Sequence, residues 1–420
     1  MNPFTPATIA SLTRQFGTPL WIYDADTITR QIAALRLFDV VRFAQKANSN
    51  THILRLMKRQ GAVVDSVSLG EIERALAAGF TPGLHKGRAD IVFTADLLDR
   101  ATLARVVELN IPVNCGSMDM LDQLGAVKGA VNPGHPVWLR INPGFGHGHS
   151  RKTNTGGEHS KHGIWHGDLV RACEKIKSNG LALQGLHMHI GSGVDYAHLQ
   201  EVCSAMLKLV EVVNAQGLDL HAISAGGGLS VPYQAGEPTT DTAHYFSLWD
   251  AARHAVEQRL GHPVKLEIEP GRYLMAESGV LVTEVRATKQ QGANHFVMVD
   301  AGFSDLVRPA LYGSYHGMEL IHSDGTAVNG LQFDTVVAGP LCESGDVFTQ
   351  GEGGEVLHRS LPQAQVGDLL VLHDTGAYGA SMSSNYNARP LIAEVLMENG
   401  EPRLIRRRQT VAELLALEAV

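Results

Sequence analysis

Eight apolar segments alternate with helix-length segments between residues 40 and 270, and this alternation limits the possible folds more than any other feature of the chain. The segment SLGEIERALAAG, for example, begins with Ser68 and Glu71 in capping-box spacing and ends at Gly79, which predicts a helix. Strands that alternate with helices form a parallel sheet. The pattern therefore predicts an α/β fold, a (β/α)8 TIM-like barrel over residues 26–275, close to the roughly 250 residues typical of that fold. The expected strands are VVRFAQKA, AVVDSVS, DIVFTA, PVNCGS, VWLRINPG, LQGLHMHI, HAISAGGG and VKLEIEP.

The pattern changes after Arg272. Runs such as GVLVTEVRATKQ, HFVMVDAG, FDTVVAGP and GDLLVLHDTG are separated by turns, with few helices between them. These runs predict a C-terminal antiparallel β-domain over residues 276–420. Residues 1–25 contain the strand-like PLWIYDA and are expected to join it, because chain termini often lie close together. The last stretch, RQTVAELLALEAV, is typical of an amphipathic helix.

Composition excludes several classes of function. The formal net charge is -8, so the chain lacks the basic surface of a nucleic-acid-binding protein. No apolar run approaches the ~20 residues of a membrane span, and the N-terminal residues lack the basic start and apolar core of a signal peptide. The cysteines are scattered, without a C-x-x-C pair, which argues against disulfides and structural zinc. The four cysteines are Cys115, Cys173, Cys203 and Cys342. Together these features predict a cytoplasmic enzyme.

The stretch GLHMHIGSG places His187 and His189 two residues apart on the sixth expected strand, with their side chains on one face. Such a pair can hold a metal, or it can lie over a flat cofactor. Barrel hydrolases carry their His-x-His on the first strand, with further His and Asp ligands on later strands. Here the other strand ends supply Lys, Gly and Glu, so no metal is expected. We interpret His189 as a residue that stacks on a cofactor, and His187 as a core histidine.

The carboxyl ends of the barrel strands, where the active site of this fold lies, carry an unusual set of residues. Each has an ordinary structural explanation when taken alone. Together they meet the needs of pyridoxal 5′-phosphate. A lysine can bind the aldehyde as a Schiff base, a glycine-rich turn can approach a phosphate, and a carboxylate can keep the pyridine nitrogen protonated. The set comprises Lys46, Asp65, Arg140, His189, Ser192, Gly226, Gly227, Gly228, Glu269 and Arg272.

Six motifs in order, FAQKAN, HMHIGSG, AGGGLS, EPGRYL, GPLCESGD and DTGAYGASMSSNYN, extend along the chain. Through them the chain resembles the diaminopimelate decarboxylase family, within the alanine racemase-like (fold type III) pyridoxal phosphate enzymes. The resemblance implies decarboxylation of meso-2,6-diaminopimelate to L-lysine and carbon dioxide, the last step of lysine biosynthesis. It also implies a homodimer with shared active sites. Small departures are Phe43, where the family often has Tyr, and His162, where it often has Phe.

The resemblance also implies the role of each site residue. Lys46 is expected to form the Schiff base, His189 to stack on the ring and Glu269 to pair with the pyridine nitrogen. The β-domain of the partner subunit is expected to supply Cys342, as proton donor, and Glu343, as acceptor for the distal amino group. The other expected cofactor-binding residues are Asp65, Arg140, Ser192, Gly226, Gly227, Gly228, Gly271, Arg272 and Tyr378, and the other expected substrate-binding residues are Arg272, Arg308, Tyr312 and Tyr378.

The segment 144–166 has abundant glycine and five histidines, at positions 147, 149, 159, 162 and 166. It is predicted to be a mobile active-site loop that contacts substrate or the partner subunit, with a metal site as the alternative. Three alternatives to the function also stand. They are a related decarboxylase of arginine, ornithine or carboxynorspermidine, a racemase and a regulatory pseudoenzyme. Glu269 argues against the racemase, in which an arginine normally faces the ring nitrogen. A pseudoenzyme would be expected to lack Lys46 or Cys342.

Overall fold

The computed structural model describes residues 4–128, 134–146, 156–189, 191, 193 and 195–420. The chain forms two compact units, one of residues 31–230 and 239–271, the other of residues 1–30, 231–238 and 272–420. The segment 231–238, which falls inside the barrel in the sequence-based division, groups with the second unit. Its Tyr233 explains this, because the phenol oxygen accepts hydrogen bonds from Arg272 and Arg308 of that unit.

The first unit is a closed parallel barrel, as predicted. Each strand pairs in parallel with the next, and the last pairs back with the first through Glu267 opposite Val40 and Ile268 opposite Val41. A short strand, β9 (Ile164–Trp165), pairs in parallel with the last two residues of β8. All eight expected strands are present: β2 (Val40–Ala44), β3 (Val63–Ser66), β6 (Ile91–Ala95), β7 (Val113–Cys115), β8 (Pro136–Asn142), β10 (Ala182–His187), β11 (Ala222–Ser224) and β12 (Lys265–Ile268).

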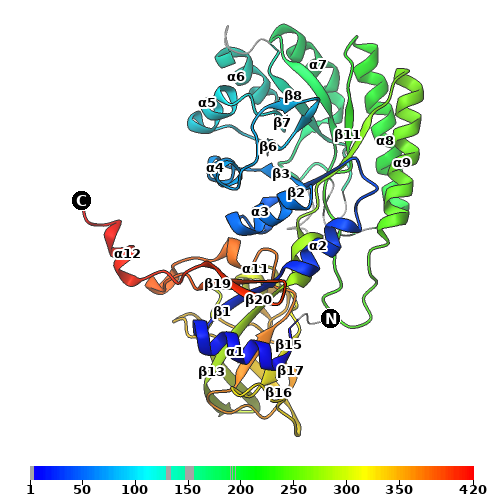
Figure 1. The fold of residues 1–420 in the computed structure, drawn as a ribbon. Helices are drawn as coiled ribbons and strands as arrows, with labels where there is room; N and C mark the ends of the chain where they lie inside the picture. Colours follow the sequence, from blue (N-terminus) through cyan, green and yellow to red (C-terminus); the bar gives the residue numbers. More distant parts are fainter. Residues whose placement is uncertain (1–3, 129–133, 147–155, 190, 192, 194) are drawn as a thin grey trace. The chain divides into compact units, whose positions relative to one another are not determined.

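Helices surround these strands (Figure 1). The helix expected from capping-box spacing is α4 (Leu69–Ala77), and the Ser68 hydroxyl accepts the N–H of Glu71 at 3.2 Å. A side-chain acceptor at this position satisfies a backbone donor that the helix itself leaves unpaired. The others around the barrel are α3 (Thr51–Arg59), α5 (Arg100–Glu108), α6 (Met118–Lys128), α7 (Leu169–Ser178), α8 (Tyr196–Ala215) and α9 (Thr242–Leu260).

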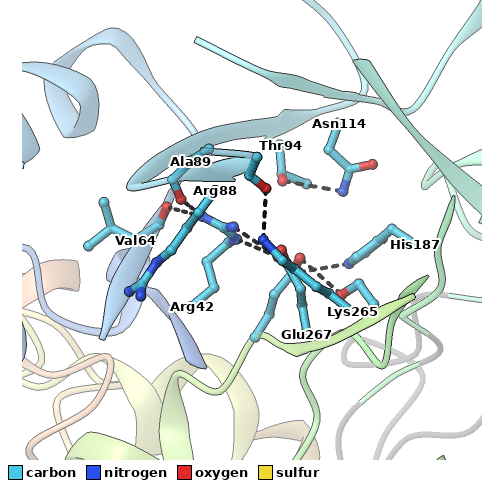
Figure 2. Close-up of polar contacts among 12 residues, drawn as sticks. Arg42, Val64, Arg88, Ala89, Thr94, Asn114, His187, Lys265 and Glu267 are labelled. Atoms are coloured by element: carbon cyan, nitrogen blue, oxygen red, sulfur yellow. Dashed lines mark hydrogen bonds and ion pairs between the residues drawn. The ribbon is translucent and has the colours of Figure 1, made fainter. Parts of the chain in front are cut away.

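The barrel interior contains a buried ion pair. Arg42 on β2 donates to Glu267 on β12 at 2.8 Å, and its Nη1 donates to the backbone carbonyls of Val64 and Ala89 (Figure 2). Both charged side chains are almost fully buried. A buried charge is tolerated when it is paired and its remaining donors are satisfied. The guanidinium therefore connects the first, second and last strands of the barrel from the inside.

The second unit is built on a nine-stranded sheet that is rich in antiparallel pairs. This agrees with the antiparallel β-domain that the sequence predicts, although two pairings, β1 with β19 and β14 with β16, are parallel. The N-terminal strand β1 causes the first of these, because it lies between β13 and β19. The strands are β1 (Leu20–Asp24), β13 (Gly279–Gln291), β14 (Asn294–Val299), β15 (Met318–Ile321), β16 (Gln332–Ala338), β17 (Arg359–Pro362), β18 (Leu369–Leu372), β19 (Ala393–Glu398) and β20 (Glu401–Arg406).

The core of the second unit packs strands β1, β13 and β18 against the first helix, α1 (Pro6–Phe16). Leu20, Ile22, Val280, Val282 and Val371 are fully buried there. The remaining α-helices are α2 (Ala25–Ala33), α10 (Arg272–Met275), α11 (Arg308–Tyr312) and α12 (Val411–Ala416), the last within the helix expected at the C-terminus. Within the described ranges, no helix combines the length and apolar character that crossing a membrane requires.

Candidate active site

The carboxyl ends of the barrel strands bring together most of the residues that the sequence singled out. Lys46 lies in the turn Gln45–Ala47 directly after β2, and Glu269 directly follows β12. The N–H of Ala44 donates to the carbonyl oxygen of Pro270 at 3.1 Å. This bond ties the two strand ends together, and Gly271, which is buried, comes next in the chain.

Glu269 is held by a donor on each of its two oxygens. His187 Nε2 lies 2.7 Å from Oε2, and the Ser224 hydroxyl donates to Oε1 at 3.2 Å. Burial opposes ionisation of this carboxyl, but the His187 imidazole and the charge of Arg42 outweigh it and lower the pKa of Glu269 to about 2. Glu269 is therefore a buried anion at neutral pH, as a partner for a protonated ring nitrogen must be.

Asp65 lies on β3, and its pKa is shifted in the opposite direction to that of Glu269. Burial and the nearby charge of Glu269 raise the pKa of Asp65 to about 8, although a hydrogen bond with Thr94 and the charge of Lys46 act against this. Its Oδ1 is buried and has no hydrogen-bond partner among the described residues. The barrel mouth thus holds two carboxyl groups of which one is ionised and the other accepts a proton near neutral pH.

His189 follows β10, and its Nδ1 accepts the backbone N–H of Gly227 at 3.2 Å. This bond leaves Nε2 as the protonated nitrogen of the neutral ring. Burial, together with the charges of Arg140 and Lys46, holds the pKa of His189 well below its usual value. Arg140, on β8, is itself buried, and this burial lowers its pKa while Asp96 and Glu269 act in the opposite direction. His189 is therefore a neutral ring held against the glycine turn.

The glycine turn after β11 has no room for side chains. A Cβ atom at Gly226 would lie 2.3 Å from the carbonyl oxygen of Met188, and one at Gly227 would lie 2.6 Å from that of Glu269. Gly226 and Gly228 also have positive φ angles, 62° and 105°, which disfavour other residues. Bare backbone at the mouth of a parallel barrel can approach a phosphate closely.

A second group of predicted residues meets in the second unit around Tyr233. The Tyr233 phenol oxygen accepts hydrogen bonds from Arg272 and from Arg308, each at 2.9 Å. Burial opposes ionisation of this phenol, but the two guanidinium charges prevail and lower the pKa of Tyr233. The Tyr378 ring faces Arg272, with 5.3 Å between the guanidinium carbon and the ring centroid. Tyr312, the last residue of α11, is half-buried.

Tyr378 has a φ angle of 58°, in the left-handed region that non-glycine residues seldom adopt. Strained backbone of this kind gathers at functional sites. The sequence predicts a cofactor or substrate role for Tyr378, and its contact with Arg272 is consistent with that role.

Cys342 is exposed, whereas the other three cysteines are buried. A buried carboxylate, Asp346, fixes the loop that carries it by accepting the backbone N–H groups of Leu341 and Phe303, each at 2.7 Å. The N–H of Cys342 itself donates to Asn387 at 2.9 Å. The loop therefore presents the thiol and the exposed Glu343 from a defined backbone.

Ser192 lies outside the described residues, as do His147 and His149 of the histidine-rich segment. Of the histidines in that segment that are described, His162 pairs with Asp96 at the end of β6, with 2.5 Å between Nδ1 and Oδ2. Asp96 also accepts the N–H of Gly163 at 2.9 Å. Within the described part of the chain, no three His, Cys, Asp or Glu side chains are grouped as metal ligands.

Comparison with known proteins identifies the family. The family model for the pyridoxal-dependent decarboxylase, pyridoxal binding domain, matches residues 25–276. Diaminopimelate decarboxylase of Escherichia coli (strain K12) is 66% identical over 415 residues, which cover 99% of this chain and 97% of the relative. The chain belongs to the diaminopimelate decarboxylase family.

Solved structures agree with this family. A crystal structure of diaminopimelate decarboxylase superposes with a TM-score of 0.94 at 65% identity, covering 100% of this chain and 99% of the other. The enzyme from Helicobacter pylori, solved in complex with L-lysine, has a TM-score of 0.86 at 30% identity, covering 98% of this chain and 99% of the other. The cofactor expected from the sequence, pyridoxal phosphate, is that of the family.

The residues of the barrel mouth suit this cofactor on physical grounds. The glycine turn presents backbone without side chains, because a Cβ atom there would collide with neighbouring carbonyl oxygens, and Glu269 is an anion that a cationic ring nitrogen can neutralise. The unpartnered Oδ1 of Asp65 offers a further polar contact. Sequence reasoning missed the bonds that position these groups, above all that of His187 to Glu269. It treated His187 as a core histidine, because the sequence does not show which side chains meet across a barrel.

Proposed function

We propose that the chain binds pyridoxal phosphate at the barrel mouth and removes carbon dioxide from meso-2,6-diaminopimelate, giving L-lysine. The observation that carries this proposal is the anionic Glu269 at the same barrel end as Lys46 and the glycine turn. When bound, pyridoxal phosphate supplies an electron sink for the bond that breaks at the substrate α-carbon.

Each barrel residue has a task in this scheme. Lys46 would hold the cofactor through its aldehyde, at the position that the substrate amine would take over. Glu269 keeps the ring nitrogen protonated, because its own pKa is far below that of a pyridine. His189, a neutral imidazole, would stack on the cofactor ring without adding a second positive charge.

Backbone N–H groups and cationic side chains are expected to bind the phosphate group. We assign Gly226, Gly227, Gly228 and Ser192 to the phosphate, with Arg272 and Tyr378 beside it. Asp65, Arg140 and Gly271 complete the cofactor-binding set. The assignment of Arg140 is supported by its place on β8 near Glu269, whose charge acts on the Arg140 guanidinium.

The substrate carries a second carboxylate and a second amino group at its distal end. We assign the distal carboxylate to Arg272, Arg308 and Tyr312, because a guanidinium binds a carboxylate with two parallel hydrogen bonds. L-Lysine, which the Helicobacter pylori relative holds in its crystal, has a single carboxylate and fits the expected product.

We further propose a homodimer in which Cys342 and Glu343 of the partner subunit complete each site. Cys342 delivers the proton that replaces carbon dioxide, and Glu343 accepts a hydrogen bond from the distal ammonium group. The exposed thiol on a fixed loop supports this proposal. We also propose that the enzyme is cytoplasmic, because free cysteines suit a reducing compartment.

The test is a substrate comparison. Purified enzyme loaded with pyridoxal phosphate is given meso-diaminopimelate, arginine or ornithine, and carbon dioxide and the amine product are measured. We expect one lysine for each carbon dioxide from diaminopimelate, and little release from the other two, which lack a distal carboxylate. Faster release from arginine or ornithine would favour the alternative, a related decarboxylase of another basic amino acid.

A further inference from the structure

The His-x-His motif contains a histidine to which the proposed function gives no task. His187 is the last residue of β10, and its side chain is 1% exposed inside the barrel. His189, two residues later, is bonded to the glycine turn. Figure 2 shows the His187 ring directed into the barrel interior, where Arg42 and Glu267 form a separate ion pair.

His187 Nε2 lies 2.7 Å from the Oε2 atom of Glu269, and both side chains are buried. The other oxygen of Glu269 accepts the Ser224 hydroxyl at 3.2 Å. These donors come from β10 and β11, and Glu269 follows β12, so three consecutive strands fix the carboxylate. A carboxylate has about four acceptor sites, and one donor on each oxygen leaves room for a further donor.

The imidazole has a defined tautomer. Its Nδ1 is buried and finds no hydrogen-bond partner in the described part of the chain. A proton on Nδ1 would therefore be a buried donor without an acceptor, which is costly. The proton lies on Nε2 and is donated to Glu269, so His187 is a fixed donor that stabilises the ionised carboxylate.

Other charged groups face the same carboxylate. Arg42 on β2 and Arg140 on β8 are the nearby cations. The neutral ring of His189 follows β10, and Asp65 on β3 is the neighbouring carboxyl group. Of the groups that favour the ionised form, the His187 imidazole has the largest influence. Loss of His187 thus removes the donor that most favours a charged Glu269, while Arg42 and Arg140 remain.

We propose that His187 is a positioning residue for Glu269, whose hydrogen bond fixes the orientation and the anionic form of the carboxylate that holds the cofactor nitrogen protonated. This inference rests on the proposed function, in which Glu269 pairs with that nitrogen. His187 acts through Glu269 and has no contact with the reacting atoms in this scheme. Its loss should therefore change the state of the ring nitrogen more than the binding of substrate.

The test uses the full-length enzyme loaded with pyridoxal phosphate labelled with ¹⁵N in the ring. Three variants are compared with wild type: His187→Leu, which has no donor, His187→Gln, whose amide can donate, and His187→Asn, whose amide is shorter. The ¹⁵N chemical shift reports protonation of the ring nitrogen, and kcat and KM for diaminopimelate are measured on the same samples. His135→Leu, at a buried histidine before β8, is the matched control.

In His187→Leu we expect the ring nitrogen to lose its proton at a lower pH than in wild type. We also expect kcat to fall about 10- to 100-fold, the range for a lost hydrogen bond to a charged group, with KM changed less than about threefold. His187→Gln should recover most of the ¹⁵N shift and of kcat, and His187→Asn should recover little. If His187→Leu does not fold, the inference is tested by the Gln and Asn variants alone, because only the Gln variant is expected to recover the ¹⁵N shift and kcat.

A folded, loaded His187→Leu enzyme with the wild-type ¹⁵N shift and kcat would overturn the inference, and so would equal behaviour of the Gln and Asn variants. Glu269→Gln, measured in parallel, separates this failure from failure of the proposed function. If Glu269→Gln shifts the ¹⁵N signal and His187→Leu does not, only the role of His187 is wrong. If neither does, the pairing of Glu269 with the ring nitrogen is wrong.

Discussion

The phenol oxygen of Tyr233 accepts a hydrogen bond from the guanidinium of Arg308 at 2.9 Å. The same oxygen accepts a second bond, also of 2.9 Å, from Arg272. Two cations that converge on one phenol oxygen are held close together, although their charges repel each other. Tyr233 therefore positions the two arginines that we assign to the distal carboxylate of the substrate.

We predict that Tyr233→Phe raises KM for diaminopimelate roughly tenfold and changes kcat little. The variant removes the shared acceptor, and a hydrogen bond to a charged group contributes about 1.5–3 kcal/mol, where 1.4 kcal/mol is a factor of ten. Steady-state kinetics of carbon dioxide release measure KM and kcat separately. Tyr23→Phe is a suitable control, because the buried Tyr23 hydroxyl bonds Glu394 in the same unit. A Tyr233→Phe enzyme with the wild-type KM would show that the arginines need no common acceptor.

Lys46→Ala should abolish turnover and covalent attachment of the cofactor. Lys46 is the lysine at the barrel end that carries Glu269 and the glycine turn. The measurement is reduction with borohydride followed by mass spectrometry, together with the absorbance spectrum of the bound cofactor. Lys265→Ala, at the opposite end of β12, should keep both properties. Cofactor still fixed to the Lys46→Ala chain would mean that another lysine carries it.

Glu269→Gln should slow decarboxylation roughly 100-fold or more while the cofactor still binds, since fixed charges at a reacting centre contribute this much. A neutral amide cannot keep the ring nitrogen protonated, so the electron sink is weakened. Turnover and cofactor content are measured on the same preparation. Glu267→Gln, two residues earlier, breaks the ion pair with Arg42 and should lower stability instead. Near-normal turnover in Glu269→Gln would contradict its assigned role.

The pKa of Asp65 predicts how stability of the cofactor-free protein changes with pH. Burial and the charge of Glu269 raise the pKa of Asp65 from 3.8 to about 8. An acid with a higher pKa in the folded state binds its proton more tightly there. Its contribution to stability is therefore complete below 3.8 and is lost as the pH rises through about 8.

Asp65→Asn cannot ionise and should escape this loss. We expect the Tm of the variant minus the Tm of wild type to increase as the pH rises from about 5 to about 9. Differential scanning fluorimetry across this range measures the trend. Asp168→Asn, at an exposed position, is measured in parallel as a surface comparison. A flat difference for Asp65→Asn would mean that the folded protein leaves the pKa of this carboxyl unchanged.

Local sequence patterns predict the strands and the residues at their ends. Parallel strands share one end, so Lys46 and Glu269 could be grouped without knowledge of any contact. The bond between His187 and Glu269 joins residues 82 positions apart, and that between Tyr233 and Arg308 joins residues 75 apart. Such pairs depend on register and on side-chain direction across the sheet, which no local pattern records.

The β-domain was harder to predict for a related reason. Strand β20 reads EPRLIR, and most of its residues are half-buried or exposed, so the sequence shows no clear apolar run. The parallel pairing of β1 with β19 joins two ends of the chain. It follows from packing of the whole unit, which the alternation of apolar residues within each strand does not specify.

The last prediction concerns the proposed shared site. Lys46 belongs to the barrel unit, and Cys342 belongs to the β-domain unit. If each active site takes Lys46 from one subunit and Cys342 from its partner, two inactive variants can complement each other. A dimer of one Lys46→Ala chain and one Cys342→Ala chain contains one site with both residues intact and one site with neither.

Random exchange makes about half of the dimers mixed, each with one of two sites intact, so activity should approach roughly a quarter of wild type, given the two-fold symmetry usual for homodimers. The two variants are unfolded together, refolded and assayed for carbon dioxide release, and native mass spectrometry measures the share of mixed dimers. A mixture of Lys46→Ala with Glu269→Gln is the matched control. Both residues lie in the barrel unit, so every site then lacks one of them if that unit comes from one subunit. No recovery in the first mixture, with mixed dimers present, would place Cys342 in the site of its own subunit.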